Sequence, residues 1–384
     1  MDREMIDIYS DYLITNFGQA TATSLSNVLN GELSHDSITR ALADRELTSK
    51  DYWKLAKPII REIQDENASL FLAPHQHLTG LGRSIDDLIV EKPHSEESGV
   101  IGYYFDHTKG RSVKGMNIVD AAYITSKARV PLDFVVVKKL EYKVDLQGKP
   151  FRPQTQTKHE ILEDILRFAV HNEVPFKTVL FDVWYGSADN MRLVKLDLNK
   201  EFITPLKGNR KVKLLETAGS TLQAVESLEL VEGKPYLARL EGVPFDVTVV
   251  KLVFKHENGH QGLLFLCASE TGLTGKKIRL GYQKRWPVEE QHKSGKRPKP
   301  VRCCCGAKKQ NTGLGSSPAS LVAARVNHVF CSFVGVLKLE CLKLKTGLNH
   351  FALKAKLRLK AVQAARDELN RLRAVHPGLI VRSA

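Results

Sequence analysis

Three acidic residues lie in separate segments of the chain, each in a setting that suits a divalent-metal ligand. Asp86 and Asp182 lie within or directly after short apolar segments, and they would meet if those segments form neighbouring strands. Glu289 follows Tyr282 by seven residues and Arg285 by four, so a helix places all three on one face. Carboxylates that converge from different elements are typical ligands of Mg²⁺ ions that act on phosphate. The pattern indicates metal-dependent phosphoryl chemistry on nucleic acid.

Each of these residues also has an ordinary structural explanation. Asp86 fits a solvated strand end, and Asp182 fits a cap before the next helix. Glu289 fits a surface ion pair with Arg285 at i, i+4 spacing, which contributes little to stability. Tyr282 fits a buried aromatic side chain of the same helix. Their combined order beside a basic region favours the functional interpretation.

Positive charge is concentrated in the C-terminal part. The chain of 384 residues has a formal net charge of +14, with 42% hydrophobic and 26% charged residues. From Lys276 onward there are 24 Lys and Arg residues against 5 Asp and Glu residues. That imbalance predicts contact with a polyanion such as nucleic acid. The first residues lack a signal-peptide pattern, and the apolar run at 326–339 is too short for a membrane span, so we expect a cytoplasmic protein.

The first 75 residues have the periodicity of short helices. These helices are expected at about residues 5–17, 23–29, 35–43 and 51–66. The second and third flank a turn at Asn30 and Gly31, which fits a helix-turn-helix whose second helix enters a DNA groove. Ser37, Thr39 and Arg40 would face outward on that helix and are candidates for contacting DNA.

From about residue 78 the pattern changes to short strands. Strands are expected at residues 85–90, 100–106, 117–125, 132–137, 178–181 and 202–206, with helices at 158–170 and 187–198. Strands followed by helix–strand alternation predict an α/β fold with a mixed sheet. Residues 211–270 are again mostly strand and form a predicted β-rich insertion. Helices at about 318–344 and 350–375 close the chain.

Three motifs carry a resemblance to a known family. They are Asp86-Asp87 leading into Glu91-Lys92-Pro93, Phe181-Asp182-Val183-Trp184-Tyr185, and Tyr282-x2-Arg285-x3-Glu289-x6-Lys296. With them the chain resembles the DDE transposases of the insertion sequence 4 family over nearly its whole length. The third motif is the most specific, because it has the spacing of that family's tyrosine-arginine-glutamate-lysine signature.

The resemblance implies a ribonuclease-H-like α/β fold, with a mixed sheet and a β-rich insertion flanked by N- and C-terminal helical regions. It also implies cut-and-paste transposition, in which DNA is cleaved and a freed 3′-hydroxyl is joined to target DNA. The domains implied are a helical DNA-binding domain at 1–75, the first part of the catalytic core at 76–210, the insertion at 211–270, the catalytic helix with an atypical basic loop at 271–315, and a C-terminal helical region at 316–384.

The resemblance also assigns a role to each motif residue. Asp86, Asp182 and Glu289 would be the catalytic ligands of two Mg²⁺ ions, with Mn²⁺ as an alternative cofactor. Tyr282, Arg285 and a lysine would bind DNA phosphates, a use that suits arginine's fork and lysine's point charge. The partners implied are DNA, as element ends and target, and a second copy of the chain in a synaptic homodimer. The implied location is the bacterial cytoplasm, in association with the nucleoid and with no membrane.

The chain departs from the family pattern in two places. The usual first motif, Asp-x-Ser or Asp-x-Thr, selects Asp86, but Asp87 remains an alternative ligand. Residues 297–308 look inserted after the catalytic helix, so the spacing favours Lys296 as the phosphate-binding lysine while the neighbouring residues favour Lys309. Two alternatives to an active transposase stay open. One is a catalytically inactive DNA-binding copy, which the insertion favours, and the other is a non-transposing metal-dependent nuclease.

Overall fold

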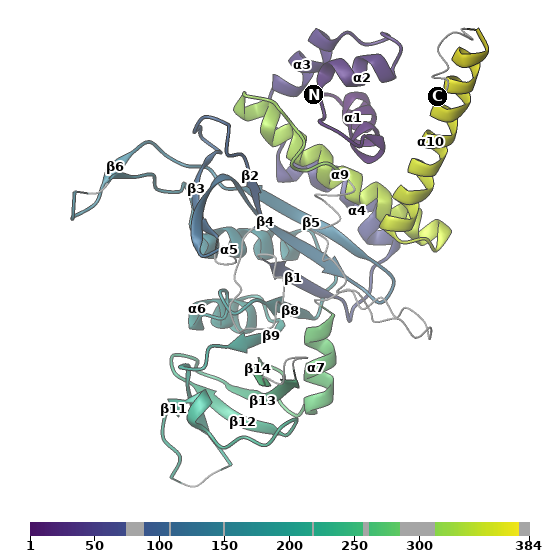
Figure 1. Cartoon of the computed structure of the whole chain (residues 1–384). Coiled ribbons are helices and arrows are strands. Elements are labelled where there is room, and N and C mark those ends of the chain that lie inside the picture. Colours follow the sequence, from purple (N-terminus) through teal and green to yellow (C-terminus); the bar gives the residue numbers. More distant parts are fainter. Residues whose placement is uncertain are drawn as a thin grey trace, which may run out of the picture.

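A large mixed sheet lies between a helical bundle at one end of the molecule and a β-rich extension at the other (Figure 1). The computed structural model describes residues 1–73, 88–106, 109–148, 150–216, 219–255, 261–284 and 312–375. The helices are α1 (Arg3–Thr15), α2 (Ala22–Val28), α3 (His35–Ala43), α4 (Ser49–Glu62), α5 (Lys158–His171), α6 (Ala188–Arg192), α7 (Gly275–Gln283), α9 (Val322–Thr346) and α10 (His350–Val375), with a π-helical turn at Leu193–Asp197 and a 3₁₀ turn at Val225–Ser227.

Strands account for most of the remaining regular structure. They are β1 (Ser69–Ala73), β2 (Leu88–Glu91), β3 (Gly102–Asp106), β4 (Arg111–Ile124), β5 (Arg129–Val136), β6 (Lys143–Val144), β7 (Pro150–Phe151), β8 (Thr178–Phe181), β9 (Glu201–Leu206), β10 (Lys211–Leu214), β11 (Gln223–Ala224), β12 (Pro235–Leu240), β13 (Asp246–Lys255) and β14 (Gln261–Ala268). All except β6 and β7 belong to one sheet among the described residues.

The four N-terminal helices begin where a side-chain oxygen accepts an otherwise unpaired backbone N–H. In α3, the Ser34 hydroxyl accepts from the N–H of Ser37, while Ile38 and Leu42 turn into the core. Asn30 and Gly31 have positive φ angles of 52° and 80°, which reverse the chain between α2 and α3. The two helices pack together, so the predicted helix-turn-helix arrangement is present. The other three caps are Asp2, Thr21 and Thr48.

Five strands form the ribonuclease-H-like part of the sheet, in the order β5, β4, β1, β8, β9. β4 pairs antiparallel with both β5 and β1, whereas β8 pairs in parallel with β1 and with β9. Because parallel neighbours need a crossover connection, α5 and α6 separate these strands in the chain. The predicted fold class is therefore confirmed.

The central strand was missed. β1 lies inside the region 1–75 that was predicted to be helical throughout. Its five residues form too short an apolar run to separate a strand period from a helix period. Its pairing with β4 and β8 places it in the middle of the catalytic sheet.

The β-rich insertion extends the main sheet. β14 pairs antiparallel with β9, and β13, β12, β10 and β11 follow outward in that order. The predicted strands of residues 211–270 are thus present, as a continuation of the catalytic sheet. α7 packs on β9 and β14 through an apolar cluster that includes Ile203, Ile278 and Tyr282.

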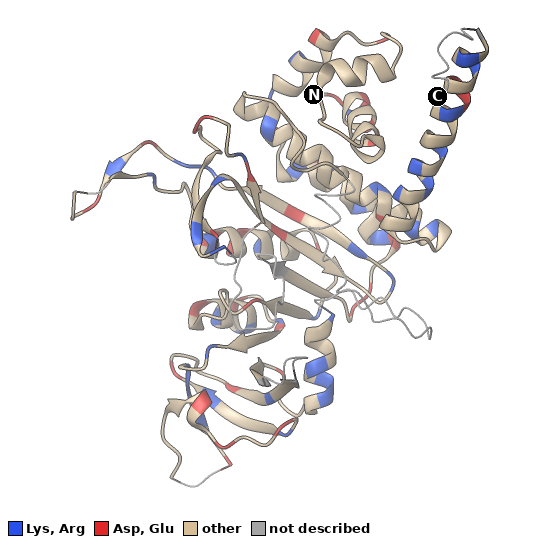
Figure 2. Cartoon of the chain, viewed as in Figure 1, with Lys and Arg blue, Asp and Glu red and all other residues tan. Residues whose placement is uncertain are grey.

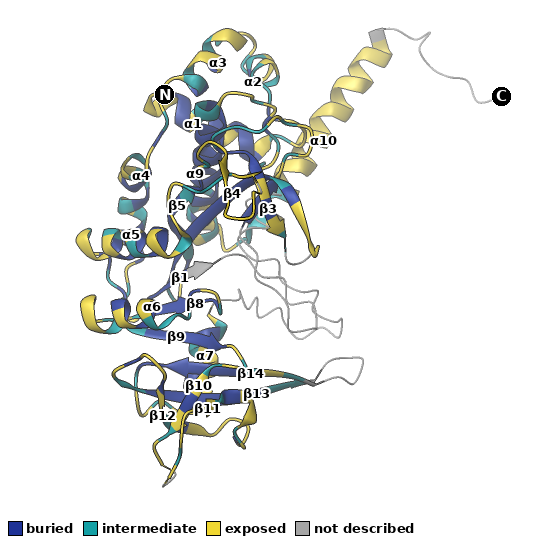
Figure 3. Cartoon of the chain, turned by 90° about the vertical axis from the view of Figure 1, so that its left-hand side faces the viewer, coloured by how far each residue is buried: buried dark blue, intermediate teal, exposed yellow. Residues whose placement is uncertain are grey.

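Helix α9 is the core helix that joins the N-terminal bundle to the sheet. It packs against α1, α3, α4 and β5. Phe333 of α9 stacks on Phe134 of β5, with ring centroids 4.0 Å apart. The helix is long and apolar enough to cross a membrane by length and composition, but 83% of its most apolar window is buried inside the protein (Figure 3). This burial is the pattern of a core helix.

Two polar side chains fix α9 to the N-terminal bundle. Asn327 accepts from the N–H of Leu47 at 2.8 Å and donates to the carbonyls of Leu42 and Arg45, both at 2.9 Å. On the next residue, His328 Nε2 lies 2.9 Å from the carbonyl oxygen of Gly313 and Nδ1 lies 3.0 Å from Tyr9 Oη. A carbonyl only accepts, so Nε2 carries the proton and Nδ1 accepts from tyrosine. Burial lowers the pKa of His328 to about 4.

His328 should make the stability of the protein depend on pH. Its unfolded pKa of about 6.5 exceeds the folded value, so protonation favours the unfolded chain as pH falls. Between pH 7 and pH 5 the free energy of unfolding should lose about 2 kcal/mol through this residue. Urea unfolding of wild type and His328→Gln at both pH values measures the effect, since the variant lacks this loss.

The comparison between the two proteins is required because Asp133 titrates in the opposite direction. Burial raises its pKa to about 6, which stabilises the folded state as pH falls. Asp133 is unchanged in the variant, so the difference isolates His328. The exposed His171→Gln variant is the control and should keep the wild-type pH dependence. An equal pH dependence in His328→Gln and wild type would contradict the prediction.

Candidate catalytic site

Asp182 directly follows the parallel strand β8 and is fully buried. Its Oδ1 accepts from the N–H of Val183 at 2.5 Å, and its carbonyl accepts from the N–H of Tyr185 at 3.0 Å. Gly186 then passes close to β9, because an added Cβ would lie 3.0 Å from Thr204 Oγ1. The turn therefore holds the carboxylate at the carboxyl edge of two parallel strands, where α/β proteins place their functional groups.

The strand beside Asp182 is β1, not the strand that follows Asp86. Leu72 of β1 pairs with Phe181, whereas β2 pairs with residues 115–118 of β4, next to the part of β4 that pairs with β1. Among the described strands β8 pairs with β1 and β9, so the approach of Asp86 to Asp182 stays a prediction. Asp86 and Asp87 themselves lie outside the described residues.

The third motif falls mostly outside the described residues. Helix α7 ends at Gln283, and Arg285, Glu289, Lys296 and Lys309 all lie in the undescribed range 285–311. Their proposed roles stay predictions.

Tyr282 is described, and it lies in the core. Its side chain is 2% exposed and packs with the apolar cluster beneath α7. The structural explanation of this tyrosine is therefore present in the fold, and its role at phosphate stays a prediction.

The outward face of α7 is strongly basic. Gly275, Ile278 and Tyr282 face the sheet, so the remaining positions of the helix point to solvent. None of the four basic residues on that face forms an ion pair within the part of the chain that the structure describes. In Figure 2 the Lys and Arg positions of α7 are coloured blue. The four residues are Lys276, Lys277 and Arg279 of α7 and Lys284, which directly follows the helix.

The candidate DNA-reading residues lie on α3 as expected. Thr39 and Arg40 are exposed, while Ser37 is half-buried. Thr39 donates to the carbonyl of His35 at 2.8 Å, and Ser37 accepts from the Ser34 hydroxyl at 2.9 Å. Arg40 reaches the Asp36 carbonyl only at 3.4 Å, so it is the most available of the three for a partner.

Sequence reasoning missed two buried acids in the sheet. Asp120 of β4 is 2% exposed and Asp133 of β5 is 3% exposed. Asp133 accepts from the N–H of Phe134 at 2.8 Å and bonds the side chain of Ser49. The signal was present in the sequence, since each aspartate interrupts a run of apolar strand residues, and a buried charge needs compensation.

Residues 312–317, which follow the undescribed range 285–311, are held beside the end of β2 by hydrogen bonds. Lys92 donates to the carbonyls of Gly315 and Ser317 at 2.9 and 2.6 Å, and burial lowers its pKa. The Thr312 hydroxyl lies 2.8 Å from that of Ser332 on α9. The segment Gly315–Ser317 therefore has a defined place in the fold, and Lys92 has a structural role in holding it.

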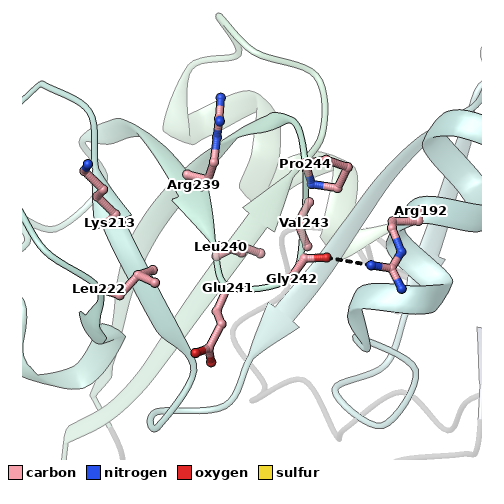
Figure 4. Close-up of a pocket in the computed structure, with 9 residues that line it drawn as sticks. All are labelled: Arg192, Lys213, Leu222, Arg239, Leu240, Glu241, Gly242, Val243 and Pro244. Atoms are coloured by element: carbon pink, nitrogen blue, oxygen red, sulfur yellow. Dashed lines mark hydrogen bonds between the residues drawn. The ribbon is translucent and has the colours of Figure 1, made fainter.

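A hollow of about 430 Å³ lies on the β-rich extension, away from Asp182 (Figure 4). Arg192 spans it and donates to the carbonyl of Gly242 at 3.1 Å. Arg192 also pairs with Asp189, and Arg239 pairs with Asp246. The two arginines of the hollow thus serve local structure. It is lined by Arg192, Lys213, Leu222, Arg239, Leu240, Glu241, Gly242, Val243 and Pro244.

Asp182 has the donor chemistry for a hard divalent cation, because Mg²⁺ prefers carboxylate oxygens. No group of three or more His, Cys, Asp and Glu side chains that could hold a metal occurs among the described residues. Two of the three predicted ligands lie outside those residues.

Comparison with known proteins identifies the family. The sequence profile described as "DDE superfamily endonuclease" matches residues 1–218, which is more than half of the chain. This chain belongs to the DDE endonuclease superfamily. The match includes Asp182 and the five central strands and ends before α7. No curated protein matches the chain.

One solved structure similar to this DDE endonuclease family member is titled "Drosophila P element transposase strand transfer complex". The two share 10% sequence identity with a TM-score of 0.29. The alignment covers 56% of this chain and 47% of that one, so the chain spans about half the length of the P element transposase.

Substitutions of Tyr282 distinguish a packing role in the core from the predicted contact with DNA phosphate. Tyr282→Ala removes a buried aromatic ring, so it should lower the free energy of unfolding by about 3 kcal/mol. Tyr282→Phe keeps the ring and should stay within about 1 kcal/mol of wild type. Chemical unfolding measures both. Wild-type stability in Tyr282→Ala, combined with weakened DNA binding, would instead support a phosphate contact.

Proposed function

We propose that this protein is a metal-dependent DNA transposase of the insertion sequence 4 type, acting by cut-and-paste transposition as a homodimer. It would cleave element ends and join a freed 3′-hydroxyl to target DNA, in the bacterial cytoplasm at the nucleoid. The observation that carries the proposal is the buried Asp182 at the carboxyl edge of β8, in a chain of the DDE endonuclease superfamily.

The catalytic residues proposed are Asp86, Asp182 and Glu289. A bound Mg²⁺ or Mn²⁺ would polarise the scissile phosphate and lower the pKa of a water molecule beside it. Within the chain, the turn after β8 keeps the Asp182 carboxylate in one orientation through the Val183 N–H. That preorganisation means the ligand does not have to be ordered when the substrate arrives.

The basic surfaces support DNA as the partner. Three cations lie on the outward face of α7, and a fourth, Lys284, directly follows the helix, shortly before Glu289 in the sequence. Helix α10 is exposed along most of its length and carries seven Lys and Arg residues against two acids (Figures 2 and 3). Helix α3, which lies at the end of the molecule away from α7 (Figure 1), adds Arg40. Such charges attract a phosphate backbone through counterion release, without regard to sequence.

An inactive DNA-binding copy is the second candidate, and one observation favours it. The residue that follows Leu72 in β1, beside the position of Asp182, is alanine and supplies no carboxylate. Asp86 is 13 residues further along the chain. The protein would then bind element ends without cutting them.

Asp182→Asn should abolish cleavage and keep DNA binding. The substitution removes the charge that a metal ligand needs while leaving an acceptor for the Val183 N–H. A labelled duplex of the element end and a target plasmid are incubated with the full chain in Mg²⁺ or EDTA. Wild type should give Mg²⁺-dependent 3′ ends and joined products, and Asp182→Asn should give at least about 10³-fold less.

The exposed Asp197→Asn variant is the matched control and should cleave like wild type. Cleavage by Asp182→Asn at the wild-type rate would remove Asp182 from the site. Binding without cleavage by wild type would establish the inactive copy. Cleavage without joined products would establish a non-transposing nuclease.

Removing positive charges from the outward face of α7 should lower the affinity for DNA and make that affinity less dependent on salt. Lys276→Gln/Arg279→Gln removes two phosphate-seeking charges from adjacent turns of the helix. The slope of log K against log salt should fall by up to about 2, and affinity at 0.1 M salt should fall about tenfold or more. Fluorescence anisotropy of a labelled duplex at several salt concentrations measures both quantities.

Lys158→Gln/Arg167→Gln on α5 is the control with the same charge change. α5 packs with the larger core on the sheet face opposite α7. The slope of log K against log salt for this control variant should match that of wild type, and its DNA affinity should fall only slightly at every salt concentration. Equal effects from the two double variants would show that net charge alone decides binding.

A further inference from the structure

Only the beginning of helix α10 is buried against the rest of the protein. The helix packs on α9 and α1, and its buried and half-buried side chains lie within residues 350–354. Every residue from 355 to 374 is exposed, and this part of the helix extends away from the body of the molecule (Figure 3). About five helical turns are therefore open to a partner.

An apolar stripe with heptad spacing runs along the exposed part of α10. It consists of Val362, Ala365, Leu369 and Leu372, and is called the α10 seam below. Steps of three, four and three residues separate its members, which is the spacing of the a and d positions of a coiled coil. Val362, Leu369 and Leu372 are 57%, 46% and 44% exposed. Large apolar side chains aligned in this way would leave water if a second helix covered them.

The charges beside the α10 seam fit a second copy of the same helix. With the seam at positions a and d, Glu368 is at position g, and Arg366 and Arg373 are at position e. In a parallel pair of identical helices, a g residue lies beside the e residue five positions further along the other helix. Glu368 therefore faces Arg373 of the partner subunit, and two-fold symmetry repeats the attraction on the other side.

The same charges disfavour an antiparallel pair. In that arrangement e positions face e positions, so Arg366 and Arg373 would lie opposite arginines of the other helix. The parallel arrangement places Arg366 beside the neutral residue Ala361 instead. Charge complementarity thus selects both the orientation and the register.

Other charged residues of α10 are compatible with this pairing. Lys356, Lys360 and Arg371 are at the outward positions b, f and c, so they stay accessible to a DNA backbone. Within one chain Arg371 pairs with Glu368 at 2.7 Å. A carboxylate has acceptor sites for more than one arginine, so the pair across the seam adds to this bond.

We propose that the α10 seam pairs in parallel with the α10 seam of a second copy of this chain. The inference rests on the homodimer in the proposed function and names the surface that forms it. The seam covers about two heptads, fewer than the three or four that are typical of a long coiled coil. The dimer should therefore dissociate reversibly on dilution.

Sedimentation equilibrium of the full chain without DNA, over a wide range of protein concentration, measures the Kd of the dimer. Leu369→Ser should raise this Kd at least tenfold, because each dimer loses two apolar side chains from its seam. Leu357→Ser is the matched control. Leu357 is 39% exposed on the same helix but is at the outward position c, so its Kd should stay within twofold of wild type. Equal effects of the two substitutions would overturn the proposal.

A charge exchange tests the parallel register. Glu368→Arg and Arg373→Glu should each raise the Kd about fivefold or more, because each places like charges opposite one another. The double variant Glu368→Arg/Arg373→Glu exchanges the two charges and should return to within about twofold of wild type. Arg371→Gln removes only the pair within one helix and should leave the Kd unchanged. A double variant as weak as the single ones would overturn the register, and circular dichroism checks that every variant is folded.

The outcomes separate this inference from the proposed function. A dimer that survives Leu369→Ser with an unchanged Kd would overturn the α10 interface and leave the homodimer standing. A wild-type chain that is monomeric at every concentration would overturn the interface as well. Cleavage and joining of element-end DNA are measured separately and test the transposase proposal.

Discussion

The candidate site depends on the pairing of the short strand β1 between β4 and β8. That strand is antiparallel to one neighbour and parallel to the other, so its carboxyl end lies level with the start of the turn at Asp182. Because register sets which side chains share a face, a slip of one residue would turn Asp120 and Asp182 to opposite faces of the sheet. The buried apolar residues on both faces of these strands fix that register. The carboxylates are thus positioned by the hydrophobic packing of the sheet.

The N-terminal helices and α9 pack against β5, at the other side of the central strands from β9. α9 buries apolar side chains against β5 and against the bundle at once, and Asn327 and His328 satisfy backbone groups that would otherwise be buried without partners. Such bonds add direction to a contact that hydrophobic burial alone leaves unspecified. They connect residues nearly three hundred positions apart in the chain, so the helix-turn-helix takes a defined orientation relative to the sheet.

Much of the architecture could be predicted from the sequence, because long amphipathic segments report their own period. The predicted ranges 35–43, 178–181 and 350–375 coincide with α3, β8 and α10. β1 was missed because five residues are too few to show a strand period, so its pairing with β8 beside Asp182 was not predicted. Asp182 was found through its position after an apolar run. Asp120 was missed although it interrupts an apolar run. The face of the sheet that it shares with Asp182 could not be predicted, because a shared face is a property of strand pairing that no local pattern contains. The residues from Arg285 to Asn311 lie outside the described structure, so the third acid remains a sequence prediction.

The continuity of β9 with β14 has a mechanical consequence. An insertion that folded as a separate domain could swing on its connections at little cost. Here eight residue pairs join β13 to β14, and four more join β14 to β9. The extension is therefore a hydrogen-bonded continuation of the catalytic sheet and is held rigidly at β9. A load on its outer strands would be carried into β9 and β8 as twist of the sheet, close to Asp182. A force applied to the outer strands would in this way shift the end of β8 that positions Asp182, without any contact there.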